Sequence, residues 1–318
     1  MCSRNSGRVV PFIEEQAESV RRLGHTVDFF TIEGKGIGGY LKNWLPYIAK
    51  LRIFQPNVVH AHYGLSCLFA NLQRRVPVVS TYHGSDINDP KVFRFSKIAI
   101  KLSRRNVFVS EKITPLTPLE TSPPAPLLEE RGEGEGRDKN VVIPCGVDTT
   151  LFVPMDKQEC RERMKLEAEK KYVLFAGAFD NKVKNAAPAK AAVELLKDVE
   201  LLELKGYSRQ EVVWLMNAVD AVLMTSFTEG SPQFIKEAMA CNCPVVSVLV
   251  GDVPEVIQDV KGCYLASYDE KDIADKLQKV FAEGQRTEGR EVIIERQLDL
   301  MQVAERIETV YGLVVNDK

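Results

Sequence analysis

The chain contains 318 residues with a formal net charge of -2, and 45% of its residues are hydrophobic and 27% charged. This length suits two α/β domains of ordinary size, and the near-neutral charge argues against nucleic acid as a partner. The start, MCSRNSGRVV, lacks the apolar core of a signal peptide, and no apolar run approaches the roughly 18 residues that cross a bilayer, so we expect a cytoplasmic protein.

Helical and extended patterns alternate along the first half of the chain. Apolar spacing and short Val-rich runs predict, in order, helix 11–24, strand 25–32, helix 41–54, strand 57–64, helix 65–75 and strand 77–84. This alternation is typical of parallel βαβ units, so residues 1–150 are predicted to form a Rossmann-like domain. Only MCSRNSG precedes the first helix, where a buried strand is normal. We therefore expect the first strand to be missing, through loss or because the true start lies upstream.

The same alternation resumes in the second half. Residues 114–139, between the halves, are rich in Pro, Gly and Glu and predict a disordered insertion, which composition favours over a functional lid. The pattern then continues as strand 172–179, helix 186–197, strand 199–206, helix 209–219, strand 220–226, helix 232–240, strand 244–250 and helix 254–260. Residues 151–318 are predicted to form a second Rossmann-like domain, and a final helix over 300–314 carries an apolar stripe.

The most informative stretch is TEGSPQFIKEAMACNCPVVS, which contains two glutamates. Glu229 is predicted at the carboxyl end of a strand, the edge where open α/β sheets bind ligands. Gly230 and Ser231 open a helix whose free N–H groups favour a phosphate or a sugar hydroxyl. Glu237, two turns later, could accept hydrogen bonds from a ribose diol. Taken alone, the two glutamates are better explained as a helix-start acid and a solvated surface residue.

The surrounding residues point to a known family. The run EGSPQFIKEAMACNCPVV followed by VGDVPEVI resembles the E-x7-E signature of the family 4 retaining glycosyltransferases. The resemblance implies the GT-B fold, with two Rossmann-like domains facing a cleft, the donor in the second domain, the acceptor in the first, and the final helix crossing back. It places Glu229 beside the transferred sugar and Glu237 beside the nucleotide ribose, with Gly230, Ser231 and Pro232 as further donor contacts.

A second constellation lies in LFAGAFDNKVKN, where a strand runs into a glycine turn at Gly177 and then a helix. Lys184 could neutralise a diphosphate there, or it could be an ordinary surface lysine. The family places an arginine just after the glycine and a lysine six residues further on. Lys184 matches that lysine, but Ala178 stands at the arginine position. Either Lys182 substitutes for the arginine, or fewer cations hold the leaving group, which would lower the rate.

Three of the four histidines are predicted at or just beyond strand ends in the first half. His62 and His83 could bond sugar hydroxyls, or they could bind zinc with Asp86, although a catalytic zinc needs a firmly held third ligand. The resemblance implies that His83 faces the cleft near the transferred sugar. His60 is predicted to be a buried strand residue, and His25 a structural one.

Weaker matches complete the predicted site. Gly7 could allow close approach of a ligand to the first loop, although a lone glycine is weak evidence. The resemblance implies that the backbone at Gly206 and Tyr207 reads the nucleobase. Cys145 replaces an asparagine of the family's domain-junction element. Asn242 replaces a glycine at a turn, where asparagine tolerates left-handed backbone angles.

The resemblance implies a retaining glycosyltransferase that moves a sugar from a nucleotide-sugar donor to a glycan, lipid-linked or small-molecule acceptor. Glu229, His83 and Lys184 are the expected catalytic residues. No divalent metal is expected, because no Asp-x-Asp motif lies near the donor elements, and Cys241 and Cys243 lack a second pair of ligands. Two alternatives stay open: a sugar-nucleotide epimerase of the same fold, and a non-catalytic homologue that binds a nucleotide or a partner.

Peripheral contact with the inner face of a membrane is a further expectation, because many relatives use lipid-linked acceptors. Basic residues that could form the contact are Lys42, Lys50, Arg52, Arg74 and Arg75, although solvated surface charges are the more ordinary interpretation.

Overall fold

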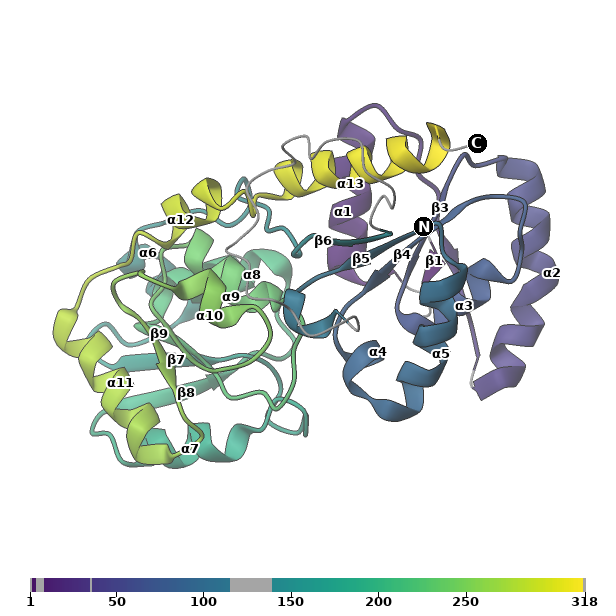
Figure 1. Ribbon diagram of the computed structural model, residues 1–318. Coiled ribbons are helices and arrows are strands. Elements are labelled where there is room, and N and C mark those ends of the chain that lie inside the picture. Colours follow the sequence, from purple (N-terminus) through teal and green to yellow (C-terminus); the bar gives the residue numbers. More distant parts are fainter. Residues whose placement is uncertain (1, 4–8, 35, 115–138, 317–318) are drawn as a thin grey trace.

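Two parallel sheets, each covered by helices on both faces, make up the computed structural model, which describes residues 2–3, 9–34, 36–114 and 139–316 (Figure 1). The N-terminal sheet has the order β2-β1-β3-β4-β5-β6, and the C-terminal sheet has the order β11-β10-β9-β7-β8. All strand pairs in both sheets are parallel. This is the doubly wound GT-B architecture that the sequence predicts.

The N-terminal sheet and its helices come from the first half of the chain. The strands are β1 (Cys2–Ser3), β2 (Phe30–Thr31), β3 (Val59–His62), β4 (Val78–Tyr82), β5 (Arg105–Phe108) and β6 (Asn140–Val142). The helices are α1 (Pro11–Arg22), α2 (Gly36–Phe54), α3 (Gly64–Asn71), α4 (Ser85–Asn88) and α5 (Pro90–Leu102), with a short 3-10 turn at Glu111–Ile113.

The expectation that the first strand is missing is wrong. Cys2–Ser3 form β1, which lies between β2 and β3 and pairs with both. The place of the first strand in the sheet is therefore occupied, although by only two residues. The segment MCSRNSG has no apolar run that would mark a buried strand, so only its partners in the sheet identify it. The predicted insertion falls almost wholly outside the described residues.

The C-terminal sheet is built from the second half. Its strands are β7 (Lys171–Phe175), β8 (Val199–Glu203), β9 (Ala221–Met224), β10 (Val245–Val248) and β11 (Cys263–Ala266). The helices are α6 (Lys157–Met164), α7 (Ala186–Glu194), α8 (Arg209–Ala218), α9 (Gln233–Ala240), α10 (Val253–Ile257), α11 (Glu270–Glu283), α12 (Gly289–Glu295) and α13 (Leu300–Asn316). The sequence patterns predict most of these elements but not β11, α6, α11 or α12.

Local sequence explains several boundaries. Ser208 and Glu211 form a reciprocal capping box that starts α8. Asn242 has a φ of 55°, the left-handed conformation expected at this turn. The strand predicted over 25–32 is confined to β2, and α2 continues through Pro46. Propensity therefore locates these elements better than it locates their ends.

The last helix lies on the first domain (Figure 1). Apolar residues of α13, including Val303 and Ile307, pack in one buried cluster with Val79 of β4 and Val107 of β5. The chain reaches this position through a crossing at Val147, whose N–H donates to the Leu298 carbonyl at 2.9 Å and whose carbonyl accepts from Leu300 N–H at 2.9 Å. The chain thus passes between the two sheets twice at one junction.

No helix among the described residues combines the length and apolar character that crossing a bilayer requires.

Candidate active site

The predicted donor residues gather at the carboxyl edge of the C-terminal sheet. There β7 has β8 on one side and β9 on the other, so the chain winds in opposite directions from β7. Loops that leave neighbouring strands at such a point diverge and open a crevice, where doubly wound sheets bind ligands. The loop after β7 carries Gly177 and Lys184, and the loop after β9 carries Glu229, Gly230 and Ser231.

Two of the predicted catalytic residues form an ion pair in this crevice. Lys184 Nζ lies 2.7 Å from Glu229 Oε1, and both side chains are largely but not fully buried. Gly177 has a φ of 151°, and a Cβ on it would lie 2.9 Å from Lys184 Cγ. A side chain at position 177 would therefore push the lysine out of place. The pair thus places one cation and one carboxylate side by side in the crevice.

Glu237 is buried on α9 and engages a residue that the sequence analysis missed. Arg209 Nη1, at the start of α8, lies 2.6 Å from Glu237 Oε1, and Arg209 Nη2 lies 2.8 Å from Glu15 Oε1 on α1. Burial raises the pKa of the Glu237 carboxyl, and the neighbouring guanidinium opposes that rise. The arginine also lies 4.7 Å above the Phe152 ring. Arg209 thus links Glu237, the residue predicted to accept hydrogen bonds from the ribose, to Glu15 of the first domain.

A second missed group lies under the glutamate loop. Lys236 on α9 is fully buried, and its Nζ lies 2.8 Å from Asp252 Oδ2 and also contacts Ser231 Oγ. Ser231 Oγ donates to Asp252 Oδ2 at 2.6 Å and accepts from the Cys145 N–H at 3.1 Å. The sequence carries a signal for this group, because Lys236 lies in the mostly apolar helix QFIKEAMA, where a buried lysine needs a partner.

We expect the Lys236→Ala variant to lose about 3–5 kcal/mol of unfolding free energy, because Asp252 would stay buried without its cation. Denaturant unfolding of the purified chain measures the loss. The double variant Lys236→Met with Asp252→Leu should recover much of it, since an apolar pair replaces a buried ion pair with little penalty. A loss below about 1 kcal/mol in the single variant would show that the pair does not hold the loop.

The three histidines near the predicted strand ends form a stack. His60 and His62 belong to β3, and His83 follows β4. The ring centroids of His60 and His62 are 4.3 Å apart, those of His62 and His83 are 5.3 Å apart, and His62 Nδ1 lies 3.1 Å from His83 Nε2. Burial lowers the pKa of His83 to about 3, so its imidazole is neutral at physiological pH. His60 is buried, as the sequence predicts.

Asp86 was considered above as a possible zinc ligand, but in the structure its carboxylate binds backbone N–H groups. Its carboxylate accepts the backbone N–H groups of His83 and Gly84 at 3.0 Å and that of Gly64 at 3.1 Å, so it joins two loops. Within the described ranges, no group of three or more His, Cys, Asp or Glu residues could hold a metal ion. His25, predicted to be structural, lies 2.6 Å from Glu308 of α13.

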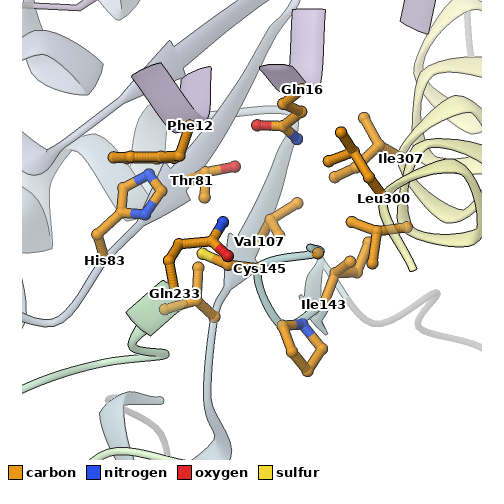
Figure 2. Close-up of a pocket in the computed structure, with 14 residues that line it drawn as sticks. Phe12, Gln16, Thr81, His83, Val107, Ile143, Cys145, Gln233, Leu300 and Ile307 are labelled. Carbon is orange, nitrogen blue, oxygen red and sulfur yellow. The ribbon is translucent and has the colours of Figure 1, made fainter. Parts of the chain in front are cut away.

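The two domains touch directly across the site. A Cβ on Gly230 would lie 2.2 Å from the His83 carbonyl oxygen, and a Cβ on Gly84 would lie 2.9 Å from the Gly230 nitrogen. Beside this contact is a cavity of about 20 Å³, room for about one water molecule. Figure 2 shows His83 beside Phe12 at one end of the cavity and Ile307 of α13 at the other. This cavity is too small for a sugar ring.

Other predicted residues lie around this centre. Pro232 is the residue before α9, and Lys182 is exposed on the loop after β7. Gly206 has a φ of 84°, and Tyr207 is 39% exposed on the loop after β8. Gly7 lies outside the described residues. Cys145 lines the cavity, and burial raises the pKa of its thiol to about 11, so a neutral thiol occupies the asparagine position.

Two glycosyltransferase family profiles match this sequence, one in each half of the chain. The profile for Glycosyltransferase Family 4 matches residues 9–114, and the profile for Glycosyl transferases group 1 matches residues 158–283. A Bacillus subtilis protein that carries the name teichuronic acid biosynthesis glycosyltransferase TuaC is 26% identical over 64% of this chain and 56% of its own length. D-inositol 3-phosphate glycosyltransferase of Mycobacterium marinum is 25% identical over 67% of this chain and 53% of its own length. The chain thus spans little more than half the length of these relatives.

Solved structures share the fold across nearly the whole chain. Sucrose-phosphate synthase from Thermosynechococcus elongatus superposes with a TM-score of 0.80 at 16% identity, covering 100% of this chain and 96% of that one. Anabaena HepE, solved in complex with UDP, gives a TM-score of 0.71 at 15% identity and covers 98% of both chains. These likenesses show the GT-B fold, and the two family profiles, one in each half, show that the chain belongs to the family 4 (group 1) glycosyltransferases.

Proposed function

We propose that this protein is a retaining glycosyltransferase that takes a sugar from a nucleotide-sugar donor. The observation that carries the proposal is the Lys184–Glu229 pair at the switch point of the C-terminal sheet, with the His83 loop facing it across the cleft. A cation paired with a carboxylate, opposite a loop that carries a neutral imidazole, suits a sugar that leaves a diphosphate. HepE has also been solved in complex with UDP-glucose, which supports a nucleotide-sugar donor.

The donor would bind mainly to the C-terminal domain. Glu237 would accept hydrogen bonds from the ribose hydroxyls through the carboxylate oxygen that Arg209 leaves free. Lys184 and the backbone N–H groups of Gly230 and Ser231, just ahead of α9, would hold the diphosphate. The loop of Gly206 and Tyr207 after β8 lies at the same sheet edge and would face the base.

Transfer would take place on one face of the sugar. The bond between the anomeric carbon and the diphosphate oxygen breaks while the acceptor oxygen bonds to the same face, and the acceptor proton passes to the departing diphosphate. Lys184 stabilises the negative charge that develops on the leaving group, and Glu229 and His83 position the sugar. We propose that no divalent metal takes part, so transfer should persist in EDTA. The absence of an Asp-x-Asp motif supports this.

Calorimetric titration with UDP, GDP, ADP and their sugars tests the donor site. We expect one nucleotide to bind saturably, and the Glu237→Ala variant to weaken it about 10- to 100-fold, since a hydrogen bond to a charged group contributes about 1.5–3 kcal/mol. Glu194→Ala, an exposed carboxylate on α7, is the matched control and should bind like the wild type. A folded protein that binds no nucleotide would instead support the non-catalytic alternative.

Mass spectrometry of donor and product separates the remaining alternatives. A transferase consumes donor in proportion to glycosylated acceptor, and nuclear magnetic resonance of the product would show the donor's anomeric configuration retained. An epimerase would alter the donor or release nucleotide without any acceptor.

We also propose that α2 contacts an anionic lipid surface, which would bring a lipid-linked acceptor to the first domain. The helix lies at the outer edge of the N-terminal domain, away from the second sheet (Figure 1). Its solvent face exposes Leu41 by 71%, Leu45 by 76% and Ile53 by 85%. The sequence of α2 contains three basic residues and no acidic one. Lys50 pairs with Asp28 at 2.8 Å, and the exposed aliphatic side chains together with Lys42 and Arg52 suit an interfacial helix.

Co-sedimentation with lipid vesicles tests this contact. We expect the protein to bind phosphatidylglycerol vesicles more strongly than phosphatidylcholine vesicles. The double variant Leu41→Gln with Leu45→Gln should weaken binding at least about tenfold, because each leucine gains roughly 1.5–3 kcal/mol when fully buried in lipid. Leu195→Gln, which changes a leucine that is 54% exposed on the other domain, is the control. Equal binding by all three proteins would exclude α2 as the contact.

A further inference from the structure

His62 contacts His83, the predicted sugar contact, from the side of the buried sheet. The surroundings of His62 determine which of its ring nitrogens carries the proton. The side chain is fully buried at the end of β3. Its Nδ1 lies 3.1 Å from His83 Nε2, while its Nε2 is buried without a hydrogen-bond partner among the described residues. Only one of the two rings can donate in the shared hydrogen bond.

The unpaired nitrogen decides which ring donates. If His62 carried its proton on Nε2, that buried N–H would have no acceptor. If the proton is on Nδ1, Nε2 has only a lone pair without a donor. Buried N–H groups without acceptors are the rarer and more costly case. We therefore assign the proton to Nδ1 of His62, which donates to His83 Nε2. Burial holds both pKa values far below neutrality, so neither ring gains a second proton at physiological pH.

The same hydrogen bond sets the tautomer of His83. Because His83 Nε2 accepts, the single proton of that ring belongs on Nδ1. His83 Nδ1 has no hydrogen-bond partner among the described residues, yet it is not one of the enclosed unpaired atoms. His83 lines the cavity between the domains with Gln233 and Phe12 (Figure 2), so its Nδ1–H is the group that remains for a bound oxygen.

The stack around His62 prevents other arrangements. His60 lies on its far side and is held at both ring nitrogens, at 2.6 Å from the Tyr311 hydroxyl and at 2.6 Å from Thr81 Oγ1. Phe12 contacts the His83 ring edge-on at a centroid distance of 5.0 Å, and the Tyr63 ring lies 4.7 Å away. Neither imidazole can turn over without displacing these rings, so the tautomer and the orientation are fixed together.

We propose that His62 is a positioning residue that fixes His83 as a hydrogen-bond donor through Nδ1 to an oxygen of the transferred sugar. The proposal rests on the transferase function proposed above. His83 then acts as a hydrogen-bond donor and not as a base. Its tautomer is set by the hydrogen bond from His62 and not by the intrinsic preference of a free imidazole. A donor fixed in advance needs no reorganisation when the sugar binds.

Three variants separate this role from simple packing. His62→Phe fills the same space without a donor, whereas His62→Asn places an amide N–H near the position of Nδ1. We expect His62→Phe to lower kcat about three- to tenfold, the effect of one lost hydrogen bond, with His62→Asn recovering part of the loss. In the His83→Ala background, His62→Phe should cause no further loss, because His62 acts only through His83. Additive losses would overturn the proposal.

Nitrogen-15 spectra of the histidine rings give a readout that needs no turnover. In the wild-type chain we expect His83 to show a protonated Nδ1 and a bare Nε2, and in His62→Phe a mixture of the two tautomers. An unchanged His83 tautomer in His62→Phe would refute the positioning role whatever the activity. A wild-type protein with the predicted tautomer but without nucleotide binding or transfer would instead refute the proposed function, and leave the assignment of the protons intact.

Discussion

The Lys184→Ala variant is expected to lower kcat for sugar transfer by about 10²- to 10³-fold, the loss that follows removal of one group aimed at a developing charge. The lysine is the cation that lies against Glu229, and Ala178 supplies none at the position where the family has arginine. Donor affinity should fall less than kcat, because the charge of the leaving diphosphate grows in the transition state. Initial rates at saturating donor, together with calorimetric binding, separate the two effects.

Lys182 provides the matched comparison. It lies two residues earlier on the same loop but is exposed to solvent, so Lys182→Ala should change kcat less than about tenfold. If Lys182→Ala caused the greater loss, Lys182 would be the substitute for the missing arginine and our assignment of Lys184 would be wrong. Losses of similar size would mean that both lysines share the diphosphate.

The Gly230→Ala variant is expected to lower kcat about 100-fold while leaving each domain folded. The added Cβ would lie 2.2 Å from the His83 carbonyl oxygen and 2.9 Å from Val109 Cγ2, both in the other domain. Gly230 is not one of the glycines with positive φ, so its own backbone can accept alanine. The methyl group must therefore act by holding the domains apart, and a misplacement of about 1 Å at a reacting centre can cost that much.

The binding data should distinguish this effect from damage to the donor site. We expect Gly230→Ala to bind nucleotide within a few-fold of the wild type and to show a larger radius of gyration by small-angle scattering. Gly312→Ala, in the helix α13 with open space around its Cβ, is the control and should retain full activity with slightly higher stability. Full activity in Gly230→Ala would show that transfer does not require the contact between Gly230 and His83.

Short-range sequence patterns were sufficient to predict the fold class and the positions of the two glutamates. Alternating Val-rich strands and amphipathic helices predict the doubly wound halves, because the apolar faces that build the sheets repeat at fixed periods. The E-x7-E run places Glu229 and Glu237 at the end of β9 and on α9, because strand, turn and helix follow one another within one segment. The left-handed turn at Asn242 is likewise a local property of the backbone.

Other features depend on segments that meet only in the folded chain. β1 is recognised by its partners on either side, since two residues carry no periodic pattern of their own. Arg209 reaches Glu237 and Glu15 from an ordinary helix start, and no local signal reveals that its guanidinium joins two domains. The pairing of His62 with His83 arises because β3 and β4 are neighbours in register, which places their carboxyl ends side by side. Periodicity records which face of an element is buried, whereas the partner across that face is decided by packing between distant segments.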